Sequence, residues 1–313
     1  MGCQQAEEIE KLGKELRMTI EASIGESDIV AGRYASNGGP NDVSFANGDA
    51  IGLSVNGGDF VEWTYNGSWS QNGDASNWNN KIDNHAFRAF YPFFNGASLD
   101  NVPMPELTGQ GGTMESVAEC DFLYTTKTQN YGADGKVSFT DDDAFKHVSS
   151  LIALTIKGDE DLASATINKI TMEGTNILTP SSYSFDTDEV SLDEDVNKAV
   201  SQLEAVVSHS MNSEDATFYF VVNSNTVNLS DVELGIEYEF EDDSQYKATH
   251  KGLNKNGVND QFEKGKLYSY TLNIKDRMLI ISGSSIANWV DGESLGDINM
   301  NGSKQEESED EDA

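Results

Sequence analysis

The sequence predicts an all-β protein made of β-sandwiches in tandem, with few or no helices. Short apolar segments recur with a period of two, which is the pattern of strands buried on one face. Turn-forming stretches rich in Asn, Gly and Asp separate these segments. The only segment that could form a helix, residues 191–209, is a poor candidate because it contains several valines, whose side chains are restricted in helices. The 313 residues suffice for two domains of about 150 residues each.

A hairpin near the C-terminus is the clearest element. Alternate residues of 268–274 are apolar, which predicts a strand buried on one face. Residues 275–276 form the predicted turn, and 278–281 form the return strand. Trp289 then closes the predicted ordered part as a large ring that can cap one end of a core.

Changes in composition divide the chain into four segments. Residues 1–17 are polar and charge-rich, and we expect a leader or tether there. Residues 18–136 form the predicted N-terminal β-sandwich domain, and residues 137–300 form the C-terminal one. The Gly- and Asp-rich stretch 131–136 marks the boundary between them. The acidic segment 301–313 is predicted to be a disordered tail.

The charge of the chain excludes two classes of partner. Asp and Glu number 54 against 20 Lys and Arg, which gives a formal net charge of -34. Such a field repels nucleic acid and anionic lipid headgroups, so we expect neither as a partner.

Two cysteines bear on the cellular location. Cys3 and Cys120 are too few to predict a structural disulfide. Gly2 and Cys3 match the last two positions of a bacterial lipoprotein cleavage site, which predicts lipidation of Cys3; the alternative is an incidental cysteine. No apolar run approaches the roughly 18 residues that span a bilayer, so membrane contact is expected only through a lipid on Cys3.

Catalytic motifs are absent from the sequence. It contains no nucleophile elbow, no P-loop and no glycine-rich dinucleotide fingerprint. The four histidines lack metal-ligand spacing. In residues 186–195 acidic side chains alternate with others, but the central Gly and terminal Glu of a calcium-binding EF-hand are missing. We interpret these residues as a solvated loop, with a weak adventitious calcium site as the alternative. We therefore predict that the protein is not an enzyme, and that it has no catalytic residue, metal site or cofactor.

An aromatic cluster supports two alternatives. Trp63, Trp69 and Trp78 lie among many Asn and Gly residues, a composition that suits stacking on a sugar ring. Trp63 and Tyr65 also alternate as they would in a strand, and exposed rings are costly, which favours packing in a core. Both a glycan-stacking surface and core packing remain open at this point.

The order of these motifs resembles the fimbrillin family, the lipoprotein-derived fimbrial subunits and related surface lipoproteins of Gram-negative anaerobes. The resemblance extends over about residues 18–300. Five motifs carry it: Phe45 to Asp49 followed by Ile51-Gly52-Leu53; Trp69 and Trp78 ahead of Ala89 to Phe93; Asp121-Phe122-Leu123; Phe145-Lys146-His147; and Gly265, Tyr268 and Tyr270 followed by Ile286 and Trp289.

This resemblance implies a fold and a maturation pathway. The expected fold is two transthyretin-like β-sandwich domains, and the expected role is structural and non-catalytic. The resemblance also implies lipidation at Cys3 and proteolysis after an arginine in an N-terminal loop, for which Arg33 is the candidate. That cut would release the first strand, residues 18–24, and open a groove that a strand of a neighbouring subunit fills.

Two functional hypotheses follow. The first is a pilin, tip or anchor subunit of a cell-surface fimbria, assembled by strand complementation with other fimbrial subunits and supporting cell adhesion; its precursor would be lipid-anchored at the outer membrane. The alternative is a lipid-anchored adhesin that binds host or bacterial surface glycans or proteins without polymerising, with Trp63, Trp69 and Trp78 as the stacking residues.

Overall fold

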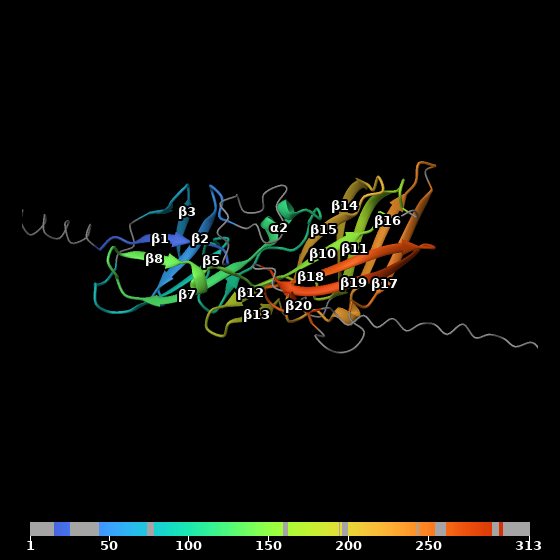
Figure 1. The fold of residues 1–313 in the computed structure, drawn as a ribbon. Helices are drawn as coiled ribbons and strands as arrows, with labels where there is room; N and C mark the ends of the chain where they lie inside the picture. Colours follow the sequence, from blue (N-terminus) through green and yellow to red (C-terminus); the bar gives the residue numbers. More distant parts are fainter. Residues whose placement is uncertain are drawn as a thin grey trace, which may run out of the picture.

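The computed structural model describes residues 16–25, 44–73, 78–158, 162–193, 195, 200–242, 244–253, 261–289 and 294–296. Within these ranges nearly every element is a strand, and the one α-helix is α2 (Met114–Cys120). The molecule is elongated, with the first strands at one end and the longest C-terminal strands toward the other (Figure 1). The predicted all-β sandwich architecture, with almost no helix, is confirmed.

Six strands of the N-terminal half form one antiparallel sheet in the order β4-β3-β2-β5-β7-β9. Their bounds are β2 (Ala50–Val55), β3 (Val61–Tyr65), β4 (Trp69–Gln71), β5 (His85–Tyr91), β7 (Leu123–Gln129) and β9 (Lys146–His147). Both faces of β5 are covered, because Phe87 and Ala89 enter the main core and Phe90 enters a second aromatic cluster. A Cβ on Gly52 would lie 2.4 Å from the ring of Phe90, so only glycine fits opposite this ring.

A second, two-stranded sheet belongs to the same half. It consists of β1 (Thr19–Ala22) and β8 (Lys136–Phe139), which pair in parallel. The predicted strand at residues 18–24 is therefore present, although its regular part is shorter. It lies at the N-terminal end of the molecule in Figure 1.

Two further sheets build the C-terminal half. One has the order β15-β10-β18-β19-β20 and the other the order β14-β11-β16-β17. Their bounds are β10 (Ser150–Ile156), β11 (Thr166–Thr175), β14 (Val200–Ser210), β15 (Ala216–Val222), β16 (Glu233–Glu239), β17 (Gln245–Lys251), β18 (Lys266–Lys275), β19 (Met278–Asn288) and β20 (Ser294–Gly296). The predicted hairpin is confirmed as β18 and β19, and its return strand extends to Asn288.

A small sheet connects the two halves. In it β12 (Ser181–Ser184) pairs with β13 (Glu189–Leu192) on one side and with β6 (Val102–Pro103) on the other. The chain thus returns from the C-terminal half to pair with a strand of the N-terminal half. Tyr183, opposite Val102, packs with Phe122 in the second aromatic cluster.

Two segments differ from what the sequence suggests. Residues 200–210, which overlap the poor helix candidate 191–209, form strand β14, because Leu203 and Ala205 are buried at alternate positions while their neighbours are exposed. Conversely, α2 lies in a segment for which the sequence predicts no helix. Thr113 starts this helix by accepting a hydrogen bond from the amide of Ser116, and the Ser116 side chain returns the bond in a capping box.

The strands after residue 136 contribute to both halves. Strand β8 begins at Lys136 and pairs with β1, and β9 pairs with β7 of the six-stranded sheet. The division into domains at 136/137 stays a prediction.

Candidate functional site

The candidate site is strand β1 together with the groove that it fills. Four residues of β1 pair in parallel with β8, from Thr19 opposite Lys136 to Ala22 opposite Phe139. Beyond the strand, the amide of Ser23 donates to the Phe139 carbonyl at 2.9 Å, and the amide of Phe145 donates to the Ser23 carbonyl at 3.0 Å. Among the described strands, only β8 pairs with β1, along one edge. Just before β1, the Leu16 carbonyl also accepts a hydrogen bond from the amide of Trp78 at 2.8 Å.

The apolar side chains of β1 and of its flanking residues are buried in the core. Met18, Ile20 and Ile24 are only 2%, 9% and 1% exposed, whereas Thr19 and Glu21 face solvent. This alternation places one apolar side chain in the core at every second position, as the sequence predicts for residues 18–24. The only ion pair of β1 in the described chain is between Glu21 and Lys136, at 2.6 Å, and both side chains are largely exposed.

A cluster of aromatic residues lies in the core near β1. Phe45 lies edge-on to Trp69, Tyr91 and Phe145, with ring centroids 5.0, 5.9 and 5.2 Å away. Phe139 of β8 contacts Phe145 in turn, at 5.8 Å. Residues from three of the five sequence motifs therefore meet in one part of the core, next to the strand that the sequence singles out.

A pocket of about 230 Å³ lies between β1 and β4. It is lined by Arg17, Met18, Thr19, Trp63, Trp69, Ser70, Gln71 and Gly73. Because Met18 is one of its walls, loss of β1 would widen this pocket into the space that the strand now occupies.

All three candidate stacking residues are buried. Trp63, Trp69 and Trp78 are 4%, 9% and 1% exposed, so none presents a ring face to solvent in this structure. The indole N–H of Trp78 donates to the Gly135 carbonyl at 2.8 Å, and its ring packs edge-on against Phe87. These contacts are those of core aromatic residues.

The two predicted modification sites lie outside the described residues. Arg33 falls in 26–43, the segment that joins β1 to the rest of the chain, and Cys3 falls in 1–15. The described thiol, Cys120, is buried in α2, and burial raises its pKa to about 11, which disfavours the reactive thiolate at neutral pH.

Three other motif residues, far apart in the sequence, meet at the junction of the two halves. The ring of His147 stacks on that of Trp289, with centroids 3.8 Å apart and planes 8° apart. On its edge, His147 Nδ1 lies 2.9 Å from Asp121 Oδ1, and both side chains are fully buried. We call Asp121, His147 and Trp289 the junction cluster.

Gly265 fastens the junction cluster to the terminal hairpin. Its amide donates to the Ser149 carbonyl at 3.1 Å, and its carbonyl accepts from the amide of Trp289 at 3.0 Å. Its φ of +69° favours glycine, and a Cβ here would lie 3.2 Å from the His147 carbonyl oxygen. The sequence motifs contain Gly265 and the residues of the junction cluster, but nothing in the sequence predicts that these residues contact one another.

A second tie across the halves centres on Lys264. Its ammonium lies 2.7 Å from Asp188 Oδ1, and it donates to the Tyr124 hydroxyl at 3.1 Å. Tyr183 also donates to Asp188, at 2.6 Å. Burial alone would raise the pKa of Asp188, but the hydrogen bonds from Lys264 and Tyr183 outweigh it and lower that pKa. Burial and the bond to Asp188 both raise the pKa of Tyr183, which keeps its hydroxyl neutral.

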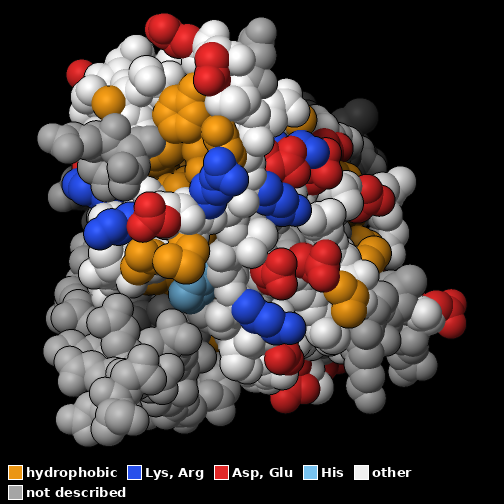
Figure 2. Space-filling model, turned by 90° about the vertical axis from the view of Figure 1, so that its right-hand side faces the viewer, with side chains coloured by type: hydrophobic (Ala, Val, Ile, Leu, Met, Phe, Trp, Pro, Cys, Tyr) orange, Lys and Arg blue, Asp and Glu red, His pale blue; other side chains and the backbone are white. Residues whose placement is uncertain are grey.

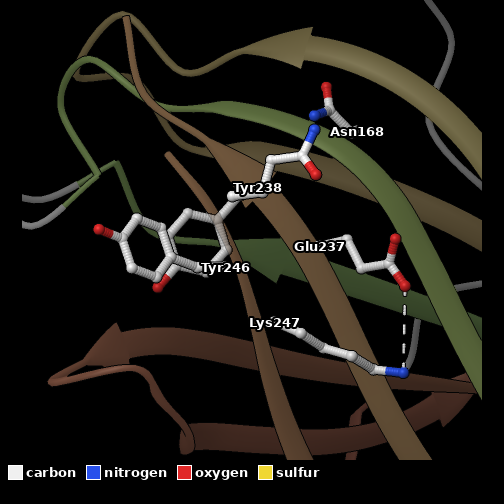
Figure 3. Close-up of a pocket in the computed structure, with 6 residues that line it drawn as sticks. Asn168, Glu237, Tyr238, Tyr246 and Lys247 are labelled. Atoms are coloured by element: carbon white, nitrogen blue, oxygen red, sulfur yellow. Dashed lines mark ion pairs between the residues drawn. The ribbon is translucent and has the colours of Figure 1, made fainter. Parts of the chain in front are cut away.

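The opposite end of the molecule carries another hollow, of about 350 Å³, on β11, β16 and β17. Figure 3 shows Glu237 and Lys247 facing each other there, with their nearest charged atoms 4.0 Å apart. The ring of Tyr246 is already in contact with Tyr238, at 5.5 Å, and with the guanidinium of Arg277, at 4.5 Å. The hollow is thus lined by both polar and aromatic side chains. Figure 2 shows basic, acidic and apolar side chains interspersed over this end of the molecule.

The described residues show no arrangement that could bind a metal ion. None of them belongs to a group of three or more His, Cys, Asp or Glu side chains placed to hold a metal ion. The helical residues among them do not include a segment with the length and apolarity that crossing a membrane requires.

Solved structures of other proteins share this fold. A candidate cell adhesion protein of Bacteroides uniformis superposes with a TM-score of 0.59 and 17% identity, covering 88% of this chain and 99% of that chain. A candidate cell adhesion protein of Bacteroides ovatus gives 0.57 and 17%, covering 88% and 98%. A fimbrial protein of Bacteroides vulgatus gives 0.50 and 16%, covering 77% and 93%. At these identities the likeness shows the fold.

Family membership comes from the sequence itself. No curated protein sequence matches the chain. The family model described as fimbrillin-like matches residues 35–289, which is most of the chain and includes all five motifs. The predicted resemblance is thereby confirmed, and this chain belongs to the fimbrillin-like family.

Proposed function

We propose that this protein is a structural subunit of a cell-surface fimbria, that it supports cell adhesion, and that it joins its neighbours by strand complementation. Membership of the fimbrillin-like family supports the fimbrial role, and the fimbrial and cell adhesion proteins that share its fold agree with it. The observation that carries the assembly mechanism is the one-sided attachment of β1.

The geometry of β1 suits a strand that can be exchanged. Covalently, it is joined to the folded body through residues 26–43, so a cut after Arg33 would leave only non-covalent contacts on that side. The described contacts are four paired residues, the flanking backbone bonds of Ser23, the ion pair of Glu21 with Lys136 and a few apolar anchors. Burying each anchor contributes about 1.5–3 kcal/mol, so an empty groove would be strongly unfavourable.

The same geometry specifies what could replace β1. An incoming strand must run parallel to β8 and satisfy its exposed edge. It must also present apolar side chains at alternate positions, to fill the sites that Met18, Ile20 and Ile24 leave. A segment of a neighbouring subunit with this pattern would restore both the hydrogen bonds and the core.

Cys3 and the location belong to the same proposal. Lipidation of Cys3 would hold the precursor at the outer membrane before the cut, and maturation would release it into the fimbria. Whether the subunit serves in the shaft, at the tip or as an anchor depends on which donor strand it receives and gives.

Limited digestion with an arginine-specific protease tests this mechanism. We expect a cut after Arg33, followed by loss of β1 and growth of oligomers that size-exclusion chromatography and electron microscopy detect. The matched control is Arg33→Ala, which should stay uncut at this position and form no growing oligomers under the same treatment. A chain that is cut after Arg33 and remains monomeric would contradict strand complementation.

A further inference from the structure

Strand β14 is a long sheet edge that the described residues leave uncovered. It pairs with β11 on one side, and no described strand pairs with its other side. Its first seven residues, 200–206, are regular; beyond them a bulge, with Ser208 at a φ of +47°, bends the strand. Val200 and Val206 are 65% and 70% exposed on this strand.

Two other edges of the C-terminal sheets, β15 and β17, are protected. The edge of β15 is capped by Gln110, whose side chain donates to the Val221 carbonyl at 2.8 Å and accepts from the Val221 amide at 2.7 Å. Gly112 adds a further bond by accepting from the amide of Tyr219. Edge strand β17 exposes Lys247 and Lys251, and lysines discourage edge-to-edge pairing.

The sequence of β14 is complementary to itself. If two copies pair antiparallel about a two-fold axis at Leu203, residue 200 of one copy lies opposite residue 206 of the other. Val200 then meets Val206 at both ends of the paired segment, so all four exposed valines are covered. Gln202 lies opposite Glu204 at both positions between them, and an amide can donate to a carboxylate. Ser201 lies opposite Ala205 on the inner face.

Charge does not prevent this pairing locally. Glu204 is held by Lys169 of the neighbouring strand, with Nζ and Oε1 3.4 Å apart, and Lys169 is also 3.3 Å from Glu237. The charge of Glu204, which faces Gln202 of the other copy, is therefore partly offset by a cation that Glu204 shares with Glu237. The formal charge of -34 on each chain still opposes association over longer distances, and dissolved salt screens that repulsion.

We propose that β14 is a self-association surface, through which two copies of this chain join their four-stranded sheets into one continuous sheet. Two-fold dimers are the commonest symmetric assemblies, and their interfaces require self-complementarity of this kind. The contact is lateral and separate from the β1 groove, so it does not depend on the proposed strand complementation. The paired segment is short, so the dimer is expected to be weak and concentration-dependent.

Sedimentation equilibrium of the intact, uncleaved chain tests the association. From micromolar to millimolar concentration we expect a reversible monomer–dimer equilibrium that shifts toward dimer as sodium chloride is added. A chain that stays monomeric over this range at high salt would overturn the proposal.

A substitution at the edge tests its location. Val206→Lys should weaken dimerisation by at least about tenfold, because each interface would gain two cations opposite valines. Ile82→Lys is the matched control, since Ile82 is 85% exposed on a loop of the other half and should leave the dimer unchanged. Both sites are exposed, so circular dichroism should show both variants folded. Equal dimerisation of the two variants would place the contact elsewhere.

Disulfide trapping tests the register. In a Cys3→Ser background, chains with Val200→Cys are mixed with chains with Val206→Cys under mild oxidation. Antiparallel neighbours lie at a distance that suits a disulfide, so covalent dimers should form in the mixture and not in either variant alone. Trapping within one variant alone, or none in the mixture, would reject the axis at Leu203.

Discussion

Strands β1 and β18 both pair in parallel with one neighbour, yet the molecule holds them very differently. In β18, six residues pair with β10 on one side and ten pair with β19 on the other, and its apolar residues are buried in the core. In β1, four residues pair with β8 on one side only. We therefore expect the number of partnered edges, rather than the direction of pairing, to decide whether a strand can be released while the rest of the fold stays intact.

Position in the chain sharpens this difference. β18 is joined to β19 by a tight turn at Asp276 and Arg277, both with positive φ, and the hairpin then ends in the junction cluster. β1 is joined to the folded body through residues 26–43, the segment that contains Arg33. One terminal region is thus interlocked with both halves of the molecule, whereas the other is attached along one edge.

Introducing a buried charge in each strand should give the largest contrast. Leu272→Asp places a carboxylate in the core of β18 at a fully buried position, and we expect the C-terminal half not to fold. Ile20→Asp places the same group under β1, and we expect the strand to detach while the remaining sheets stay folded.

Circular dichroism and limited proteolysis distinguish the two outcomes. The Ile20→Asp variant should keep most of its strand signal and become sensitive to proteases near its N-terminus. If it unfolds as completely as the Leu272→Asp variant, β1 is integral to the fold and the comparison fails.

The alternation of apolar and polar residues predicts strands β1 and β18 better than it predicts their contacts. Alternation alone locates both strands, because one face of each is buried. The sequence also contains evidence for β14, because the valines that make residues 191–209 a poor helix candidate suit a strand, and Leu203 and Ala205 alternate with polar residues. The start of α2 is missed because Ser116 replaces the Glu or Gln of the usual capping box.

Contacts between distant segments could not be predicted in this way. Asp121, His147 and Trp289 each stand in a recognisable motif, but their stacking depends on how β9 and β19 are brought together by the fold. The same holds for Gln110, whose side chain acts as a strand neighbour to Val221. When a side chain takes the place of a neighbouring strand in this way, no periodic pattern in the sequence indicates it.

Removing Trp289 should produce the next largest effect. Trp289→Ala leaves a cavity beside a buried His147, and we expect a loss of about 3–5 kcal/mol in the free energy of unfolding. Urea denaturation measures this loss. Trp289→Phe is the control, because it keeps an aromatic face for the imidazole and should recover part of the stability. Equal losses in the two variants would contradict the stabilising role of stacking, because Phe keeps a ring face that Ala lacks.

The tie at Lys264 should contribute less, and its contribution should depend on pH. The folded-state pKa of Asp188 is lowered, so its stabilising effect is present above the unfolded value of about 3.9 and is lost as the pH falls through the folded value. We expect Asp188→Asn to be less stable than the unmodified chain at neutral pH, and the difference to shrink at acidic pH. Thermal melts over a pH series measure it. A difference that is constant with pH would contradict the role of the carboxylate.

The ion pair between Glu21 and Lys136 should have the smallest effect and yet bears most directly on β1. Both side chains are largely exposed, so Glu21→Gln should leave the unfolding of the uncleaved chain unchanged. After cleavage at Arg33, however, β1 is held only by non-covalent contacts, and the lost pair should speed its release slightly. The rate at which the cleaved N-terminal peptide dissociates, followed at low and high salt, measures this effect. The difference between variants should vanish at high salt, because screening removes the attraction between exposed charges. A difference that persists there would mean that Glu21 holds the strand by packing rather than by charge.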